Sequence, residues 1–188
     1  MRKIIVSEFI SLDGVFEGPG PDDSFKYAGW TMQYGNEEFM KFKTEELFGA
    51  GALLLGKITY DGFAKAWPTI KNAGEFGEKM NNLPKYVVSK TLKEAIWNNS
   101  TIINKNIVEE VSKLKAIEGQ DILVFGSGVL VQTLLQNNLV DEIRLLVYPV
   151  ILGSGKLFFK EGNKITLKLL EEKMFKTGVV LLRYSPLV

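Results

Sequence analysis

The chain contains no histidine and no cysteine among its 188 residues. These absences remove the commonest general base, the thiolate nucleophile and the usual ligands of zinc. We therefore expect no metal site, and we expect any chemistry to come from a bound cofactor or from carboxylates. A chain without cysteine forms no disulfide, which fits a reducing compartment, so we take the cytoplasm as the expected location.

The chain also lacks an excess of either positive or negative charge. The 23 Lys and Arg residues nearly balance the 22 Asp and Glu residues, which gives a formal net charge of +1. Without a basic field or stripe, we expect no binding to nucleic acid. No apolar run approaches the roughly 20 residues that cross a membrane, and the run at residues 4–6 is too short for a signal peptide.

Apolar segments alternate with helical patterns through most of the chain, which predicts a mostly parallel sheet with helices on both faces. The last part has no helical pattern and predicts antiparallel strands, with Pro149 inside the first of them. No linker or repeat interrupts the chain, so we expect one domain over residues 1–188. The expected strands are 3–10, 52–55, 85–89, 101–104, 121–125, 142–152, 164–171 and 179–184, and the expected helices are 37–48, 59–67, 75–83, 107–119 and 127–138.

Three short polar loops each follow an apolar run directly, at residues 56–60, 89–91 and 126–128. A strand that ends in Gly, Ser, Thr or Lys before a helix presents free backbone N–H groups and the positive end of the helix dipole. This combination binds phosphate. Three such ends in one small domain suggest a ligand with several phosphates, such as a dinucleotide.

Each residue of the first two loops has a candidate role. Gly56 lets the backbone approach a phosphate, Lys57 adds a point charge, and Thr59 is expected to cap the following helix and offer its hydroxyl. Ser89 and Lys90, next to Lys57, would suit a ribose 2′-phosphate. The alternative for each loop is an ordinary turn between a strand and the next element.

The third loop, Gly126, Ser127 and Gly128, matches a turn that binds pyrophosphate. It lacks the third glycine and the later acidic residue of the Rossmann fingerprint, so a Rossmann dehydrogenase is disfavoured. The helix expected to follow is apolar almost all round and should be deeply buried.

Three further candidates lie on the substrate side. Asp13 is either a solvated turn residue or a carboxylate that faces a substrate amine or amide. In the long irregular stretch 17–35, Trp30 and its aromatic neighbours either stack on a planar ring or anchor the loop to the core. Gly153 belongs to a turn that either is flexible or lines the site.

In this order, the segments resemble those of the dihydrofolate-reductase-like superfamily, and in particular its branch with the reductase domain of bacterial riboflavin biosynthesis, the RibD C-terminal domain. They cover nearly the whole chain. The matching segments are Ser11-Leu12-Asp13-Gly14, Gly56-Lys57-Ile58-Thr59-Tyr60, Val88-Ser89, Phe125-Gly126-Ser127-Gly128 and Pro149 with Leu152-Gly153-Ser154-Gly155.

The resemblance implies a three-layer αβα sandwich, with a mostly parallel central sheet and antiparallel C-terminal strands. It implies NADPH as the hydride donor and a homodimer as the assembly. The cofactor phosphates would lie against Gly56, Lys57, Thr59 and Ser89, and the pyrophosphate and nicotinamide against Gly126, Ser127, Gly128 and Val129. Asp13, Pro149 and Gly153 would border the substrate, which Trp30 could also contact, and Asp13 would orient it or relay a proton.

Two departures concern the substrate. The complete riboflavin enzyme carries a zinc deaminase domain, which a chain without His and Cys does not supply. Dihydrofolate reductases place an acid on the helix after the first loop, and none of the glutamates at 37, 38, 45 and 46 matches it. We expect an NADPH-dependent reductase of a small heterocycle, similar to 5-amino-6-ribosylaminouracil phosphate or to a pterin or folate. The alternatives are a non-catalytic nucleotide-binding or regulatory module and a protein that only assembles with partners.

Overall fold

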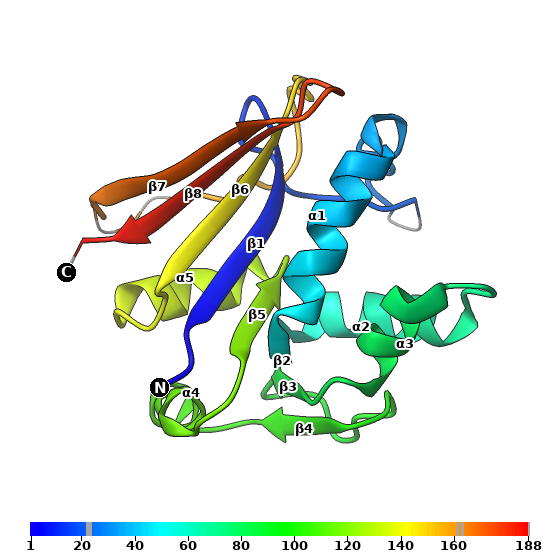
Figure 1. Cartoon of the computed structure of the whole chain (residues 1–188). Helices are drawn as coiled ribbons and strands as arrows, with labels where there is room; N and C mark the ends of the chain where they lie inside the picture. Colours follow the sequence, from blue (N-terminus) through cyan, green and yellow to red (C-terminus); the bar gives the residue numbers. More distant parts are fainter. Residues whose placement is uncertain (22–23, 161, 163, 188) are drawn as a thin grey trace.

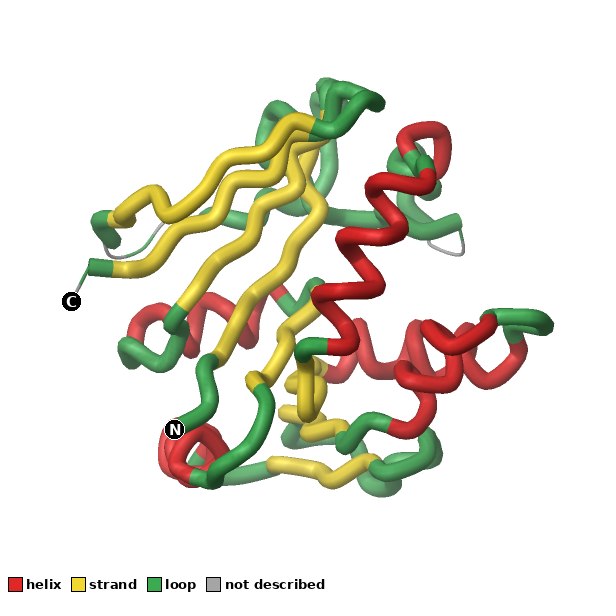
Figure 2. Tube along the Cα trace, in the orientation of Figure 1, coloured by secondary structure: helices red, strands yellow, loops and turns green. Residues whose placement is uncertain are grey.

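The computed structural model describes residues 1–21, 24–160, 162 and 164–187. Strands within these residues form one eight-stranded sheet (Figures 1 and 2). They are β1 Ile4–Ser11, β2 Ala50–Gly56, β3 Lys85–Val88, β4 Ser100–Ile103, β5 Asp121–Phe125, β6 Glu142–Tyr148, β7 Leu167–Met174 and β8 Val180–Pro186.

The strands lie in the order β4–β3–β2–β5–β1–β6–β8–β7. Neighbours from β4 to β6 run parallel, whereas β8 runs antiparallel to both β6 and β7. The first strand therefore lies inside the sheet, between β5 and β6. The predicted parallel sheet with antiparallel C-terminal strands is confirmed.

Helices cover both faces of the sheet. Leu47, Tyr60 and Met80 pack on one face, so α1, α2 and α3 form one layer, and Val111 and Leu134 pack on the other, where α4 and α5 lie. The result is the expected αβα sandwich (Figure 1). The helices are α1 Glu37–Phe48, α2 Lys57–Ala66, α3 Gly74–Asn82, α4 Ile107–Ala116 and α5 Gly128–Gln136, with 3₁₀ turns η1 Met32–Tyr34 and η2 Trp67–Thr69.

The local signals for α1 act as predicted. The side chain of Asn36 accepts a hydrogen bond from the backbone N–H of Phe39 at 2.8 Å, which caps the first turn, and Gly49 follows the last. No helix of the described residues is long and apolar enough to cross a bilayer.

Two predictions about the C-terminal strands need correction. The strand expected at 142–152 ends at Tyr148, and Pro149 follows it in an exposed position. Proline has no N–H to donate to a sheet ladder, so the ladder stops before it. The hairpin strands begin and end later than expected, because β7 spans Leu167–Met174 and β8 spans Val180–Pro186.

Two predictions about the helices also need correction. Helix α2 begins at Lys57 with Gly56 as its N-cap, so Thr59 lies inside the first turn and does not cap it. Helix α5 is not buried all round, because 73% of Val129 is exposed. The neighbouring residues Gly128, Leu130 and Val131 are buried, so the helix has one buried face and Val129 lies on the other.

Candidate functional site

The loops singled out in the sequence come together at one edge of the sheet. Strands β1, β2, β3, β5 and β6 run parallel, so their carboxyl ends share this edge. Ligands of open α/β sheets bind outside the carboxyl ends of the strands. The candidate site therefore consists of the loops after these five strands and the starts of α2 and α5.

A hydrogen-bonded junction joins the loops after β2 and β5. The hydroxyl of Ser127 accepts from the backbone N–H of Gly56 at 2.9 Å and donates to the carbonyl of Phe125 at 2.9 Å. The hydroxyl of Thr59 accepts from the backbone N–H of Ser127 at 3.0 Å. We call Gly56, Thr59 and Ser127 the α2–α5 junction. It brings two helix N-termini together, and neither has a side-chain cap.

Both glycines of the third loop are required by their surroundings. Gly126 has φ +54°, and a Cβ there would lie 2.9 Å from Oγ1 of Thr59. A Cβ on Gly128 would lie 2.6 Å from the ring of Phe16. Ser127 between them also has a positive φ, of 64°. The backbone thus turns tightly from β5 into α5, against Thr59 and Phe16.

Lys57, Ser89 and Val129 flank the junction. Lys57 is exposed and pairs with Asp61 one turn further along α2, so it is not a free cation. The hydroxyl of Ser89 accepts from the backbone N–H groups of Thr91 at 3.2 Å and Leu92 at 2.9 Å, and so it shapes its own loop.

On the other side of the site, Asp13 ties the loop after β1 to the loop after β6. Its carboxylate accepts from the hydroxyl of Ser11 at 2.6 Å and from the backbone N–H groups of Leu152 at 3.1 Å and Gly153 at 2.8 Å. The Ser11 hydroxyl and these N–H groups hold the pKa of Asp13 below its usual range. Asp13 is therefore ionised near neutral pH, and the structure brings it together with Gly153.

The aromatic residues of the stretch 17–35 anchor this stretch to the core. Trp30 is only 7% exposed, packs edge-on against Tyr148 with ring centroids 5.1 Å apart, and donates from Nε1 to the carbonyl of Glu17 at 2.9 Å. Tyr34 packs on the same ring and donates to the carbonyl of Pro149 at 3.4 Å. Of the two roles considered for Trp30, this geometry favours anchoring over stacking on a ligand.

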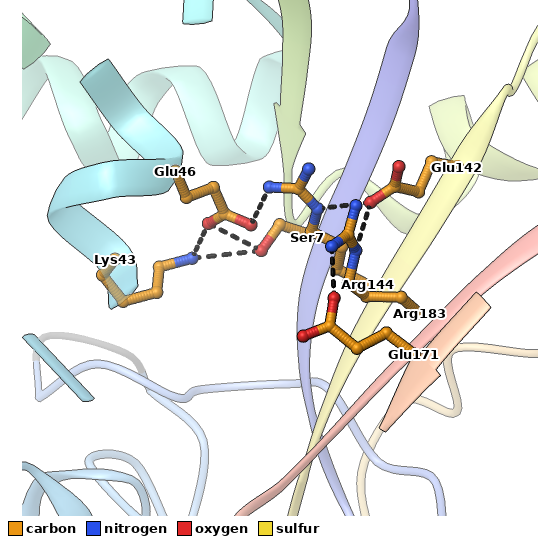
Figure 3. Close-up of polar contacts among 7 residues, drawn as sticks. All are labelled: Ser7, Lys43, Glu46, Glu142, Arg144, Glu171 and Arg183. Carbon is orange, nitrogen blue, oxygen red and sulfur yellow. Dashed lines mark hydrogen bonds and ion pairs between the residues drawn. The ribbon is translucent and has the colours of Figure 1, made fainter. Parts of the chain in front are cut away.

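Sequence reasoning missed a buried charge network beneath α1. Lys43 pairs with Glu46 and donates to the hydroxyl of Ser7 at 3.0 Å. Its ammonium group lies 4.5 Å from the ring centroid of Phe125, at the end of β5. Figure 3 shows that the network continues from α1 over the neighbouring strands β6 and β8 to β7. The further members, each paired with the next, are Arg144, Glu142, Arg183 and Glu171.

The second missed residue is Glu8, in the middle of β1. Its carboxyl group is buried, and burial raises its pKa to about 8. Oε1 accepts from the backbone N–H of Phe9 at 3.3 Å, whereas Oε2 has no hydrogen-bond partner. The sequence signal was weak, a glutamate in a strand whose other polar residues are Ser7 and Ser11.

The strand order, the two helical layers and the site at the carboxyl ends define a dihydrofolate-reductase-like α/β protein. A dihydrofolate reductase from Enterococcus faecalis, solved with NADP(H) and the compound RAB-propyl, matches with a TM-score of 0.61 at 15% identity, over 98% of this chain and 96% of that one. A pyrimidine reductase-like protein from Corynebacterium diphtheriae matches with a TM-score of 0.69 at 13% identity, over 100% of this chain and 92% of that one.

Within this class the chain belongs to the RibD C-terminal domain family, whose model matches residues 2–181. The uncharacterized protein YyaP of Bacillus subtilis (strain 168) is 34% identical to it over 189 residues, which cover 97% of this chain and 94% of YyaP. The resemblance inferred from the motifs is therefore confirmed.

Proposed function

We propose that this protein is an NADPH-dependent reductase of a small heterocyclic substrate, of the ribosylaminouracil phosphate or the pterin and folate class. Membership of the RibD C-terminal domain family supports this proposal. The observation that carries it is the α2–α5 junction, which sets two uncapped helix N-termini side by side. Such an arrangement suits a ligand with neighbouring phosphates.

The residues at the junction fit the cofactor. Thr59 and Phe16 pack directly against Gly126 and Gly128, so only glycine fits this turn, which sets the start of α5 beside that of α2. Gly56, Thr59 and Ser127 hold this turn in place, and Lys57 and Ser89 border the position proposed for the ribose phosphate. Exposed Val129 offers an apolar contact to the nicotinamide. When bound, NADPH would supply the hydride.

On the substrate side we propose that Asp13 acts as a positioning residue. A carboxylate that is ionised and accepts three hydrogen bonds is a poor proton donor. It instead holds the loop that contains Gly153. Trp30 packs on Tyr148, and Tyr34 packs on the same ring and donates to the carbonyl of Pro149, so these aromatic residues hold Pro149 in place. Pro149 and Gly153 would then border the substrate.

A fluorescence titration with NADPH and NADH tests the cofactor site. We expect the tryptophan fluorescence to be quenched saturably, with tighter binding of NADPH than of NADH. Gly126→Ala, whose Cβ would meet Thr59, should bind NADPH at least about tenfold more weakly than the wild type. The matched control is Gly62→Ala, because a Cβ at Gly62 has no neighbour within 4 Å. Absence of binding to either cofactor would contradict the proposal.

Activity requires a second measurement, the oxidation of NADPH in the presence of aminouracil, pterin and folate substrates. Turnover of one of these compounds would identify the substrate class. Binding of NADPH without turnover of any of them would favour the non-catalytic nucleotide-binding module.

A further inference from the structure

Helices α1, α2 and α5 begin at the carboxyl edge of the sheet, and the start of α1 differs from the other two. Helices α2 and α5 have no side-chain cap and no acidic residue in the first turn. In α1, the side chain of Asn36 caps the N–H of Phe39, and Glu37 and Glu38 occupy the first turn. Carboxylates at this position offset the positive end of the helix dipole. The starts of α2 and α5 therefore suit a phosphate, whereas the start of α1 disfavours an anion.

The start of α1 lies on the substrate side of the candidate site. Figure 1 shows that α1 begins at the end of the sheet where β1 and β6 end. The ring of Phe39, in the first turn of α1, packs edge-on against Tyr148, with ring centroids 6.3 Å apart. Tyr148 is the last residue of β6 and precedes Pro149, which we place beside the substrate. A substrate against Pro149 therefore lies close to the acidic start of α1.

Carboxylates also pair with lysines of the neighbouring segments. Lys156, in the loop after β6, pairs with Glu17, and its backbone N–H donates to the same carboxylate at 3.0 Å. Lys173, near the end of β7, pairs with Glu38 at 3.2 Å. Glu38 also accepts from the backbone N–H of Lys176 at 3.4 Å. The charges of Lys156 and Lys173 are thus offset by the protein itself, which reduces their attraction for an anionic substrate.

Asp13 adds a negative charge to this side of the site. The donors that its carboxylate accepts from are the hydroxyl of Ser11 and the backbone N–H groups of Leu152 and Gly153, and all three are neutral. They stabilise the ionised form without cancelling its charge. The field of this carboxylate therefore acts on whatever binds beside Gly153.

The other lysines of these segments are exposed. They are Lys26, Lys160 and Lys176, and the ammonium group of Lys26 lies 4.7 Å from the ring centroid of Tyr27. An exposed ammonium group attracts an anion only weakly, because water and salt screen its charge. The two sides of the site therefore differ: the cofactor side has two uncapped helix starts, and the substrate side has an ionised carboxylate, an acidic helix start and paired lysines.

We propose that the substrate is a neutral or cationic heterocycle without a phosphate or carboxylate group. This inference rests on the proposed function. A phosphate carries about two negative charges near neutral pH, and beside Asp13, Glu37 and Glu38 it would be repelled. A neutral ring avoids this repulsion, and its N–H groups are donors for carboxylates. Among the proposed classes, an unphosphorylated ribosylaminouracil or a simple pterin fits, whereas a ribosylaminouracil phosphate or a folate with its glutamate is disfavoured.

Steady-state oxidation of NADPH at a saturating concentration tests this inference with two matched pairs of substrates. The pairs are 5-amino-6-ribosylaminouracil without and with its phosphate, and dihydropterin with dihydrofolate. We expect kcat/KM to be at least about tenfold higher for the neutral member of each pair. For the anionic member kcat/KM should rise as salt is added, because salt screens the repulsion. For the neutral member it should not depend on salt.

A variant without the acidic start of α1 tests the cause of this preference. The double substitution Glu37→Gln and Glu38→Gln removes both carboxylates and frees Lys173 from its ion pair. We expect it to raise kcat/KM for the anionic member about threefold relative to the neutral member. The matched control is Glu109→Gln with Glu110→Gln, in the first turn of α4, which should leave this ratio as in the wild type.

The outcomes separate the two proposals. Equal kcat/KM within the pairs, or a preference for the anionic members, would overturn the inference and leave the reductase proposal in place. A preference for the neutral members that responds neither to salt nor to the double substitution would also overturn it, since charge would then not be its cause. If the double variant does not fold, the salt dependence of the wild type decides. NADPH binding without turnover of any of these compounds would count against the reductase proposal, and this inference would fall with it.

Discussion

The hydroxyl of Ser127 accepts a hydrogen bond from the backbone N–H of Gly56, across 71 positions of sequence. The same hydroxyl donates to the carbonyl of Phe125. One small side chain therefore links the last residue of β2, the last residue of β5 and the start of α5. Both proposed phosphate-binding ends depend on its position.

We expect Ser127→Ala to lower the free energy of unfolding by about 1–2 kcal/mol, because two side-chain hydrogen bonds are lost. The N–H of Gly56 loses its partner, and the two helix starts lose their alignment. NADPH should bind about tenfold more weakly. Urea denaturation and fluorescence titration measure the two effects. Thr133→Ala, an exposed hydroxyl on the same helix, is the control and should change neither.

The pair between Lys57 and Asp61 leads to a prediction about cofactor choice. Both side chains are exposed, so the pair contributes only about 0.3–0.5 kcal/mol. A phosphate near Lys57 must compete with Asp61. We expect Asp61→Asn to strengthen NADPH binding about twofold and to leave NADH binding unchanged. Lys57→Ala should weaken NADPH binding selectively, and equal losses for both cofactors would argue against a 2′-phosphate at Lys57.

We expect Asp13 to make the stability of the protein sensitive to acid. Its pKa in the folded protein lies below the unfolded value of about 3.9, so its contribution to stability is present above that value and is lost as the pH falls through the folded pKa. Asp13→Asn should therefore flatten the acid limb of the unfolding free energy while NADPH affinity stays the same. Acid titration followed by circular dichroism checks this, with exposed Glu94→Gln as control. An acid limb identical to that of the wild type would contradict it.

We expect the charge network of Figure 3 to be sensitive to substitution at its buried end and tolerant at its exposed end. None of the Glu46 side chain is exposed, so Glu46→Gln leaves Lys43 buried without its counterion and should cost about 3–5 kcal/mol. The side chain of Glu171 is 46% exposed, and Glu171→Gln should cost under about 1 kcal/mol. Thermal and urea unfolding of both variants measure the two losses of stability. Similar losses in Glu46→Gln and Glu171→Gln would show that burial does not determine the strength of these ion pairs.

Glu8 predicts the opposite pH dependence to Asp13. Its pKa rises to about 8 on folding, so the folded state binds more protons than the unfolded state between about pH 4.3 and 8. Stability should fall as the pH rises through this window, by up to about 1.4 kcal/mol per pH unit. In Glu8→Gln this slope should disappear. Urea denaturation at several pH values from about 5 to 8 measures it, and a wild-type curve without the slope would show that Glu8 is not held neutral.

Much of the fold follows from local patterns. The apolar run at β5 and the Asn36 cap of α1 define those elements within the chain itself. The start of α2 could not be predicted from such a pattern. The hydroxyl of Thr59 does not cap the helix, because it accepts a hydrogen bond from the backbone N–H of Ser127. Contacts between loops that lie 68 residues apart leave no local signal.

The same distinction applies to the site. The glycine loops and Asp13 could be singled out because turn residues after strands carry a recognisable pattern. Glu8 and Lys43 could not, since a single charged residue in a strand or helix is normally a solvated one. Glu8 is buried because the core under α5 that contains Val6 and Ile10 covers it, and Lys43 is buried because α1 packs over Phe9 and Phe125.

The position of β1 inside the sheet has a consequence for the newly made chain. Strand β1 leaves the ribosome before its partners β5 and β6, with which it pairs at Ile4 beside Ile122 and Ile5 beside Glu142. At about 5–20 residues per second, synthesis of the intervening segment takes roughly 6–24 s. During this time β1 exposes its apolar side chains and unpaired backbone. Final closure of the sheet around β1 is therefore a late step, which proceeds only after β6 has been made, at Tyr148 of 188 residues.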